Sequence, residues 1–159
     1  MNTEAMSIEE LQKVVDGLAL HSELWRDVIA HDAAERQFEL IARTERIEVW
    51  VVAWMPGHDT GFHDHDASAA AITVYEGAIS DERMSIGSEP IAVSHGAGAS
   101  FSVDAGEIHR VRHAGDAPAI TLHAYSPPLE RMGSYAVGDD GRLMRTPLDA
   151  TESLSAGQR

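Results

Sequence analysis

The stretch "GHDTGFHDHDASAAAITVYEG", residues 57–77, places three histidines within eight positions and then becomes apolar. His63 and His65 are two positions apart, so both side chains point to the same face of an extended strand. Their imidazoles can therefore reach one common point, as two ligands of a metal ion do. Gly57 and Gly77 frame the segment. A glycine-framed His-x-His followed by an apolar strand is typical of a metal-binding hairpin in a small β-barrel.

A further ligand is expected from a strand that is distant in sequence and adjacent in space. The segment "GASFSVDAGEIHRVRHAG", residues 98–115, contains a tight turn at Asp104-Ala-Gly106 and then a β-rich run. His109 and His113 share one face of this run, so both are formal candidates. We prefer His109 because it lies nearer to the turn, and we interpret His113 as a residue at the rim of the site.

Short β-rich runs separated by Gly, Pro and Asp fill the chain from about residue 36. Their spacing predicts an all-β sandwich or barrel. The expected strands span residues 36–42, 47–55, 70–80, 83–86, 90–93, 99–103, 108–113, 118–126 and 134–145. The last run contains an expected hairpin turn at Asp140-Gly141.

Two short N-terminal helices are expected before the barrel. Ser7 and Glu10 fit a capping box for the first helix. Ser22 begins the second, whose expected apolar stripe consists of Leu24, Trp25, Val28 and Ile29. We therefore expect one domain over residues 1–148, with helices in 7–31, a barrel in 36–146 and a flexible tail at 149–159.

Composition limits the possible partners and metal ligands. The 159 residues carry a formal net charge of −14, which disfavours nucleic acid and anionic membrane surfaces as partners. The chain has no cysteine, so any metal ion must be bound by nitrogen and oxygen ligands. Neither a signal peptide nor an apolar run of membrane-spanning length is visible. We therefore expect a cytoplasmic monomer or homodimer.

The two histidine segments resemble the paired motifs of the cupin superfamily, whose fold is a double-stranded β-helix or jelly roll. The positions that match the two motifs are Gly57, His63, His65 and Gly77, then Gly98, Gly106 and His109. The glutamate that most cupins use as an additional ligand falls at Ala69 or Ala70. The remaining set is three neutral imidazoles, which suit iron, copper, nickel and zinc alike.

A third motif narrows the resemblance. "LHAYSPP" at 122–128, together with "IHRV" at 108–111, "FHDH" at 62–65 and Trp54, resembles cysteine dioxygenase and related bacterial thiol dioxygenases. The resemblance covers roughly residues 34–145. It implies a mononuclear non-haem Fe(II) centre that adds both atoms of O2 to the sulfur of a small thiol and forms a sulfinate.

The resemblance also implies roles for individual residues. The iron ligands it implies are His63, His65 and His109, and the residues that match the family's Ser-His-Tyr relay are Thr121, His123 and Tyr125. These last three alternate on one strand face. Ala70 occupies the position of the cysteine that forms a thioether with the active-site tyrosine in mammalian members, so this chain cannot form that cross-link.

The family binds its substrate carboxylate with an arginine on an early strand. An ungapped count back from His63 selects Gln37, but strand parity places Arg36 on the inward face with Phe38. We prefer Arg36, because its planar guanidinium matches a carboxylate. His58 and His113 are additional histidines expected near the mouth of the site and could shape the substrate pocket.

Two further functions remain open at this stage. One is a cupin dioxygenase or isomerase that uses iron, nickel or manganese on a substrate without a thiol. The other is a cupin that binds a small molecule or a structural metal ion without catalysis. Within the leading hypothesis, the substrate is L-cysteine or a mercapto acid.

Overall fold

The computed structural model describes residues 4–85 and 87–149. One α-helix, α1 (Ile8–Leu20), is followed by two 3-10 turns, η1 (Ser22–Leu24) and η2 (Arg26–Val28), and then by the strands. The strands in this part of the chain are β1 (Gln37–Arg43), β2 (Glu48–Trp54), β3 (His63–Asp64), β4 (Ala69–Glu76), β5 (Ala78–Arg83), β6 (Ile91–Gly96), β7 (Ser100–Val103), β8 (His109–Ala114), β9 (Ala119–Ser126), β10 (Arg131–Val137) and β11 (Leu143–Asp149).

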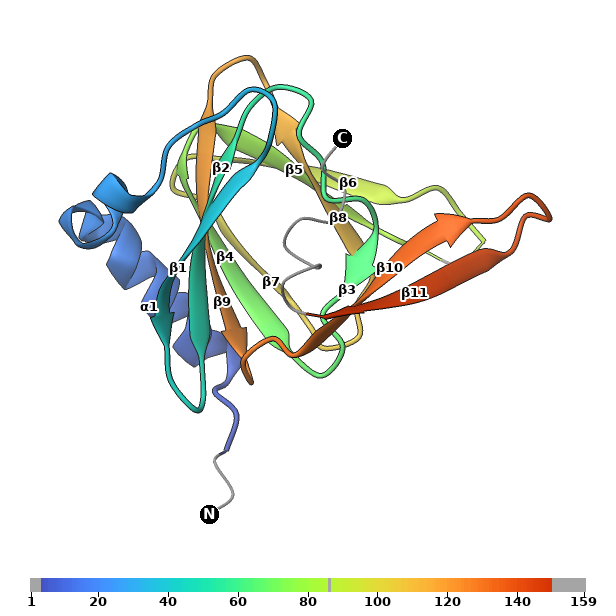
Figure 1. Ribbon diagram of the computed structural model, residues 1–159, viewed down its shortest axis with the longest axis horizontal. Helices are drawn as coiled ribbons and strands as arrows, with labels where there is room; N and C mark the ends of the chain where they lie inside the picture. Colours follow the sequence, from blue (N-terminus) through green and yellow to red (C-terminus); the bar gives the residue numbers. More distant parts are fainter. Residues whose placement is uncertain (1–3, 86, 150–159) are drawn as a thin grey trace.

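The strands form two antiparallel sheets that face each other (Figure 1). The first sheet has the order β1-β2-β9-β4-β7, and the second has the order β11-β10-β3-β8-β5-β6. The predicted all-β jelly roll of the cupin type is confirmed. No helix within residues 4–85 and 87–149 is long and apolar enough to cross a membrane.

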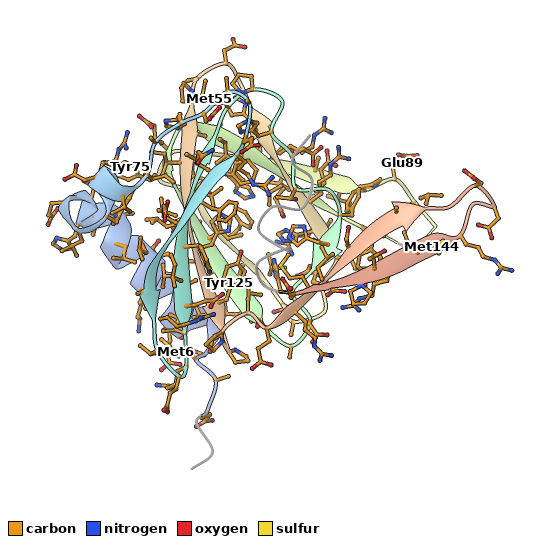
Figure 2. All side chains as sticks on the ribbon, in the orientation of Figure 1. Met6, Met55, Tyr75, Glu89, Tyr125 and Met144 are labelled. Atoms are coloured by element: carbon orange, nitrogen blue, oxygen red, sulfur yellow. The ribbon has the colours of Figure 1, made fainter. Side chains whose placement is uncertain are left out.

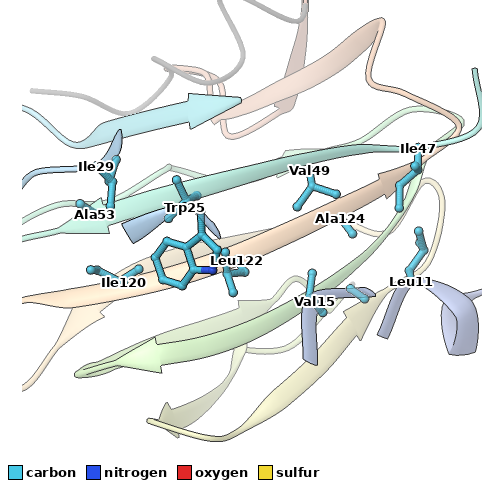
Figure 3. Close-up of a cluster of buried hydrophobic side chains, with 12 residues drawn as sticks. Leu11, Val15, Trp25, Ile29, Ile47, Val49, Ala53, Ile120, Leu122 and Ala124 are labelled. Atoms are coloured by element: carbon cyan, nitrogen blue, oxygen red, sulfur yellow. The ribbon is translucent and has the colours of Figure 1, made fainter. Parts of the chain in front are cut away.

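Helix α1 covers the outer face of the first sheet (Figure 1). Its predicted capping box is present: the Ser7 hydroxyl accepts a hydrogen bond from the Glu10 N–H at 3.2 Å, and the Glu10 carboxylate accepts one from the Ser7 N–H at 2.7 Å. Figure 3 shows the apolar layer between helix and sheet, formed by Leu11, Val15, Trp25, Ile29, Ile47, Val49, Val51, Ala53, Ala71, Ile120, Leu122 and Ala124.

Strand alternation then decides what faces the barrel interior. The odd-numbered residues of β2 and the even-numbered residues of β9 pack against the helix. Their neighbours, including Trp54 on β2 and Tyr125 on β9, consequently point into the space between the two sheets. Because alternate residues of β2 and β9 face the helix, the residues between them face the space between the sheets, where the candidate site lies.

The prediction of a second N-terminal α-helix is wrong. Residues 22–28 form the two 3-10 turns, and Leu24 and Val28 from the expected apolar stripe are 70% and 54% exposed. Trp25 fixes the segment instead: its indole donates a hydrogen bond to the Leu18 carbonyl at 2.8 Å, and its ring meets Tyr75 edge-on. So short a segment gains too few helical hydrogen bonds to offset the cost of nucleating a helix.

Two predicted strands are divided or shifted. The run 70–80 is split at Gly77, where the chain leaves the first sheet at the end of β4 and enters the second at β5. The run 134–145 is the β10–β11 hairpin, with its turn at Asp140-Gly141 as expected. Of the expected strand at 83–86, Arg83 ends β5, Met84 and Ser85 follow it outside any strand, and residue 86 lies outside the described residues. The expected flexible tail lies outside the described residues beyond position 149.

Gly77 should be the least replaceable glycine of the barrel. Its φ is +71°, and a Cβ atom there would overlap the Pro118 carbonyl oxygen and lie 2.8 Å from the Ala119 Cα. We expect Gly77→Ala to lower the free energy of unfolding by about 2–4 kcal/mol, from backbone strain and steric overlap together. Denaturant titration followed by circular dichroism measures this loss.

Gly98→Ala is the matched control, because Gly98 has a φ of +90° with nothing within 4 Å of a Cβ position. It should cost only the backbone strain, about 1–2 kcal/mol. Equal losses for both variants would show that the close approach to Pro118 is unimportant.

Candidate metal centre

A two-residue strand brings the sequence motifs together. β3 pairs with β8 through His63 and His109, and with β10 on its other side. His63, His65 and His109 are 6%, 2% and 1% exposed, and each offers a ring nitrogen within 4.8 Å of the others. The structure therefore gathers the three histidines that the sequence singles out.

Hydrogen bonds assign the tautomers of two of these histidines. His63 Nδ1 lies 2.9 Å from the Gly61 carbonyl oxygen, and His109 Nδ1 lies 2.7 Å from a carboxylate oxygen of Asp81. Both partners can only accept a hydrogen bond, so each Nδ1 carries the proton and each Nε2 keeps a lone pair. Burial lowers the pKa of all three histidines. Their neutral forms are therefore favoured.

His65 completes the donor set. Its Nε2 lies 3.4 Å from the Nε2 of His109, and its Nδ1 is buried without a hydrogen-bond partner among the described residues. The Nε2 lone pairs of His63 and His109 face this space, and a cation bound there would take the place of any proton on the Nε2 of His65. The three histidines thus fit a divalent ion of iron, nickel, copper or zinc.

Asp81 supplies a negative charge next to His109, on the side of the ring that faces away from the other two histidines. It is 3% exposed, and Arg83 Nε donates to its second carboxylate oxygen at 2.6 Å. Arg83 also donates to Glu107 at 2.5 Å and to the Ser102 carbonyl at 2.7 Å. His109 is thereby backed by an anion, while His63 is backed by a neutral carbonyl. A carboxylate behind a ligating histidine fixes the ring and raises its basicity.

A cavity opens beside the histidines. The residues that line it are Arg36, Phe38, Val52, Trp54, Thr60, His63, His65, His109, Val111, His123 and Tyr125. Apart from the histidines, the lining formed by the described residues is mostly apolar, and it contains one arginine and no carboxylate. It therefore suits a small ligand with one anionic group.

Arg36 is the cation in this cavity. It lies just before β1, is 4% exposed, and donates from Nη1 to the Asp59 carbonyl at 3.0 Å. Its guanidinium carbon lies 5.2 Å from the centre of the Trp54 ring. Burial lowers its pKa to about 10, so it stays charged at neutral pH. Gln37 lies outside the cavity lining and donates to the Glu35 carbonyl at 3.2 Å, as strand parity predicts.

Tyr125 lies near the centre of the molecule (Figure 2), and its ring centre is 5.1 Å from that of His65. A hydrogen-bonded chain lies behind it: Tyr125 Oη is 3.3 Å from His123 Nδ1, and His123 Nε2 is 2.6 Å from the Thr121 hydroxyl. Trp54 donates to the same hydroxyl at 2.9 Å. In the tautomer of His123 that carries its proton on Nδ1, Thr121 donates to His123 Nε2, His123 donates to Tyr125, and the phenolic O–H is left to donate into the cavity.

Burial also sets the charge states of this chain. It lowers the pKa of His123 to about 3 and raises the pKa of Tyr125. Both groups are neutral near pH 7, so Tyr125 retains its proton. Ala70 lies directly opposite Tyr125 on the neighbouring strand β4. The position at which the sequence resemblance implies a cross-linking cysteine thus lies beside the tyrosine and carries an alanine.

His58 and His113 do not line the cavity. His58 Nδ1 accepts a hydrogen bond from the Met55 N–H at 3.0 Å, and His113 lies beside the Ala117 carbonyl, with Nε2 at 2.6 Å. Both side chains therefore form hydrogen bonds with backbone groups of nearby loops. The structure therefore gives no geometric support to the expected roles of His58, His113 and Gln37 in binding substrate.

Comparison with known proteins agrees with this geometry. A family model for cysteine dioxygenase type I matches residues 1–137, a span that contains the three histidines, Arg36 and Tyr125. The chain belongs to the cysteine dioxygenase type I family. Cysteine dioxygenase type 1 of Danio rerio is 22% identical over 144 residues, which cover 84% of this chain and 72% of that protein.

Solved structures share the fold of this member of the family. A protein of Thermus thermophilus has a TM-score of 0.55 at 21% identity, over 65% of this chain and 93% of its own. A Klebsiella pneumoniae protein with a double-stranded β-helix domain also reaches 0.55, at 18% identity over 79% and 86% of the two chains. An oxalate oxidase has a TM-score of 0.53 at 15% identity, covering 61% of this chain and 55% of its own. At such identities, these likenesses show the fold alone.

Asp81→Asn should weaken metal binding without abolishing the fold. Asparagine keeps the shape and an acceptor for His109 but loses the negative charge. We expect the affinity for Zn(II), used as a probe metal, to fall by about 10- to 100-fold. Competition with a chromogenic chelator measures it.

Asp16→Asn is the control, because Asp16 lies on α1, on the outer face of the first sheet, where its carboxylate accepts hydrogen bonds from Thr73 and Ser100. It should leave the affinity per folded molecule unchanged. Unchanged affinity in Asp81→Asn, or equal losses in both variants, would contradict a special role for Asp81.

Proposed function

We propose that the protein is a mononuclear non-haem Fe(II) dioxygenase that adds O2 to the sulfur of a small thiol carboxylate, L-cysteine or a mercapto acid, to give a sulfinate. The observation that carries the proposal is the joint presence of a carboxylate-free three-histidine set, Arg36 and Tyr125 in one cavity. Membership of the cysteine dioxygenase type I family supports it.

The histidines would hold the iron, which supplies coordination sites where a thiolate and O2 can meet. All the ligands from this chain are neutral, so the ion keeps its full charge and favours an anionic sulfur donor. The overall reaction is balanced: one thiolate and one O2 become one sulfinate. No external reductant is needed.

Arg36 would bind the substrate carboxylate. Its guanidinium presents paired donors that match the two carboxylate oxygens. The apolar lining from Phe38, Val52 and Val111 excludes water and strengthens this contact. Within the described part of the chain, the lining has no carboxylate to pair with a substrate ammonium group. Thiol carboxylates are therefore favoured over aminothiols such as cysteamine.

Tyr125 would stabilise developing negative charge with its phenolic O–H. His123 and Thr121 orient that hydroxyl from behind, and Trp54 fixes the start of the chain. A donor that is already oriented before reaction needs no reorganisation in the transition state. The hydrogen-bonded chain thus fixes the orientation of the phenolic O–H of Tyr125.

The direct test is O2 uptake by the anaerobically Fe(II)-loaded protein with L-cysteine, 3-mercaptopropionate and cysteamine, with the sulfinate detected by mass. We expect turnover with a thiol carboxylate.

Tyr125→Phe should lower kcat by about 100-fold through loss of one oriented donor. Arg36→Gln should raise KM for the carboxylate substrate by about 30-fold or more, because a buried charge partner is lost.

Absence of O2 uptake with all three thiols would contradict the proposal. Uptake with a diol or ketone but not with thiols would instead identify a cupin oxygenase of another substrate class. A tightly bound metal ion without any turnover would identify a non-catalytic cupin.

A further inference from the structure

The loop between β2 and β3, residues 55–62, contacts both halves of the candidate site. The Asp59 carbonyl accepts the hydrogen bond from Arg36 at 3.0 Å. Two residues later, the Gly61 carbonyl accepts the hydrogen bond from His63 at 2.9 Å. One short segment, Asp59–Gly61, thus orients both the cavity cation and a histidine of the metal centre.

Arg110 fixes this segment to β8. Its Nε lies 2.9 and 3.0 Å from the two carboxylate oxygens of Asp59, and its Nη2 also donates to that carboxylate. The same carboxylate accepts the Gly61 N–H at 2.7 Å. Arg110 directly follows His109 in sequence. The ion pair therefore ties the loop to the strand that provides the third histidine.

Two hydrogen bonds between Thr60 and Val111 also attach the loop to β8. The Thr60 N–H donates to the Val111 carbonyl at 2.9 Å, and the Val111 N–H donates to the Thr60 hydroxyl at 3.0 Å. Asp59 and Arg110 are partly buried, with side chains 25% and 27% exposed. Their bidentate pair has a defined geometry, unlike an ordinary surface ion pair.

We propose that Arg110 and Asp59 are positioning residues that set the orientation of Arg36, and thereby make the site selective for thiols that carry a carboxylate. The proposal rests on the proposed thiol dioxygenase function. Removal of Arg110 leaves the Asp59 carboxylate without its main partner, so Asp59 shifts and moves the carbonyl that orients Arg36. The bonds of Thr60 to Val111 remain and hold the Gly61 carbonyl beside His63. A thiol without a carboxylate makes no use of Arg36, and its turnover is spared.

The test compares 3-mercaptopropionate with 1-propanethiol, which has a methyl group in place of the carboxylate. In Arg110→Ala, we expect KM for 3-mercaptopropionate to rise about tenfold with kcat nearly unchanged, and kcat/KM for 1-propanethiol to stay constant. Arg110→Lys should restore part of the loss through charge alone. In an Arg36→Gln background, Arg110→Ala should have no further effect, because the two residues act on the same contact.

Arg112→Ala is the matched control. Arg112 is also on β8, lies 3.7 Å from the Asp59 carboxylate and is 46% exposed, so its removal should leave both thiols unaffected. Equal losses for both thiols in Arg110→Ala, or additive losses with Arg36→Gln, would overturn the proposal. If Arg110→Ala does not fold by circular dichroism, Asp59→Asn replaces it, with the same expected selectivity.

Failure of the proposed function is distinguishable from failure of this inference. If no thiol is oxidised, binding of 3-mercaptopropionate under anaerobic conditions is measured by calorimetry and by tryptophan fluorescence, since Arg36 lies over Trp54. About tenfold weaker binding in Arg110→Ala, but not in Arg112→Ala, upholds the positioning role. Unchanged binding in both variants overturns it.

Discussion

The close approach of three buried, neutral imidazoles is the constraint on which the rest of the structure depends. Burial keeps the rings neutral, because it lowers the pKa of each one. The surrounding barrel must therefore hold the rings together and leave room for a cation. β3, which positions His63, has only two residues and pairs with β8 on one side and with β10 on the other. Asp64 anchors its other face through Tyr135 and Arg145 on the β10–β11 hairpin.

Charges around the metal centre are arranged asymmetrically. Asp81 places a negative charge behind His109, whereas Arg36 places a positive charge in the cavity. The carboxylate that most cupins use as a direct ligand is absent, and a carboxylate instead acts through a histidine ring. This arrangement leaves the ion accessible to anionic substrate groups and still strengthens one of its ligands.

Sequence patterns predicted the parts of the molecule that obey a short-range rule. Strand parity correctly separated Arg36 from Gln37 and aligned Thr121 with His123 and Tyr125, because alternate residues of a strand share a face. The capping box predicted the start of α1 for a similar local reason. The second helix was predicted wrongly, because the anchoring of Trp25 against Leu18 and Tyr75 overrides the local periodicity.

The supporting residues could not be found in the same way. Asp81 contacts a histidine 28 positions away, and Asp59 contacts an arginine 51 positions away. Side-chain pairs between distant strands leave no periodic signal in a single sequence. Only the shared strand parity of Asp81 with the apolar Ile79 could have drawn attention to it. His58 was placed near the site because it precedes the first motif, and His113 because it shares strand parity with His109, but neither side chain lines the cavity.

The most direct test of the account is X-ray absorption spectroscopy of the protein after anaerobic loading with Fe(II), combined with metal analysis. The account predicts about one iron per chain, with three imidazole nitrogens in its coordination shell, and loss of this iron in His109→Ala. Iron that is absent, or that is retained in His109→Ala with the same coordination, would contradict a metal centre formed by His63, His65 and His109.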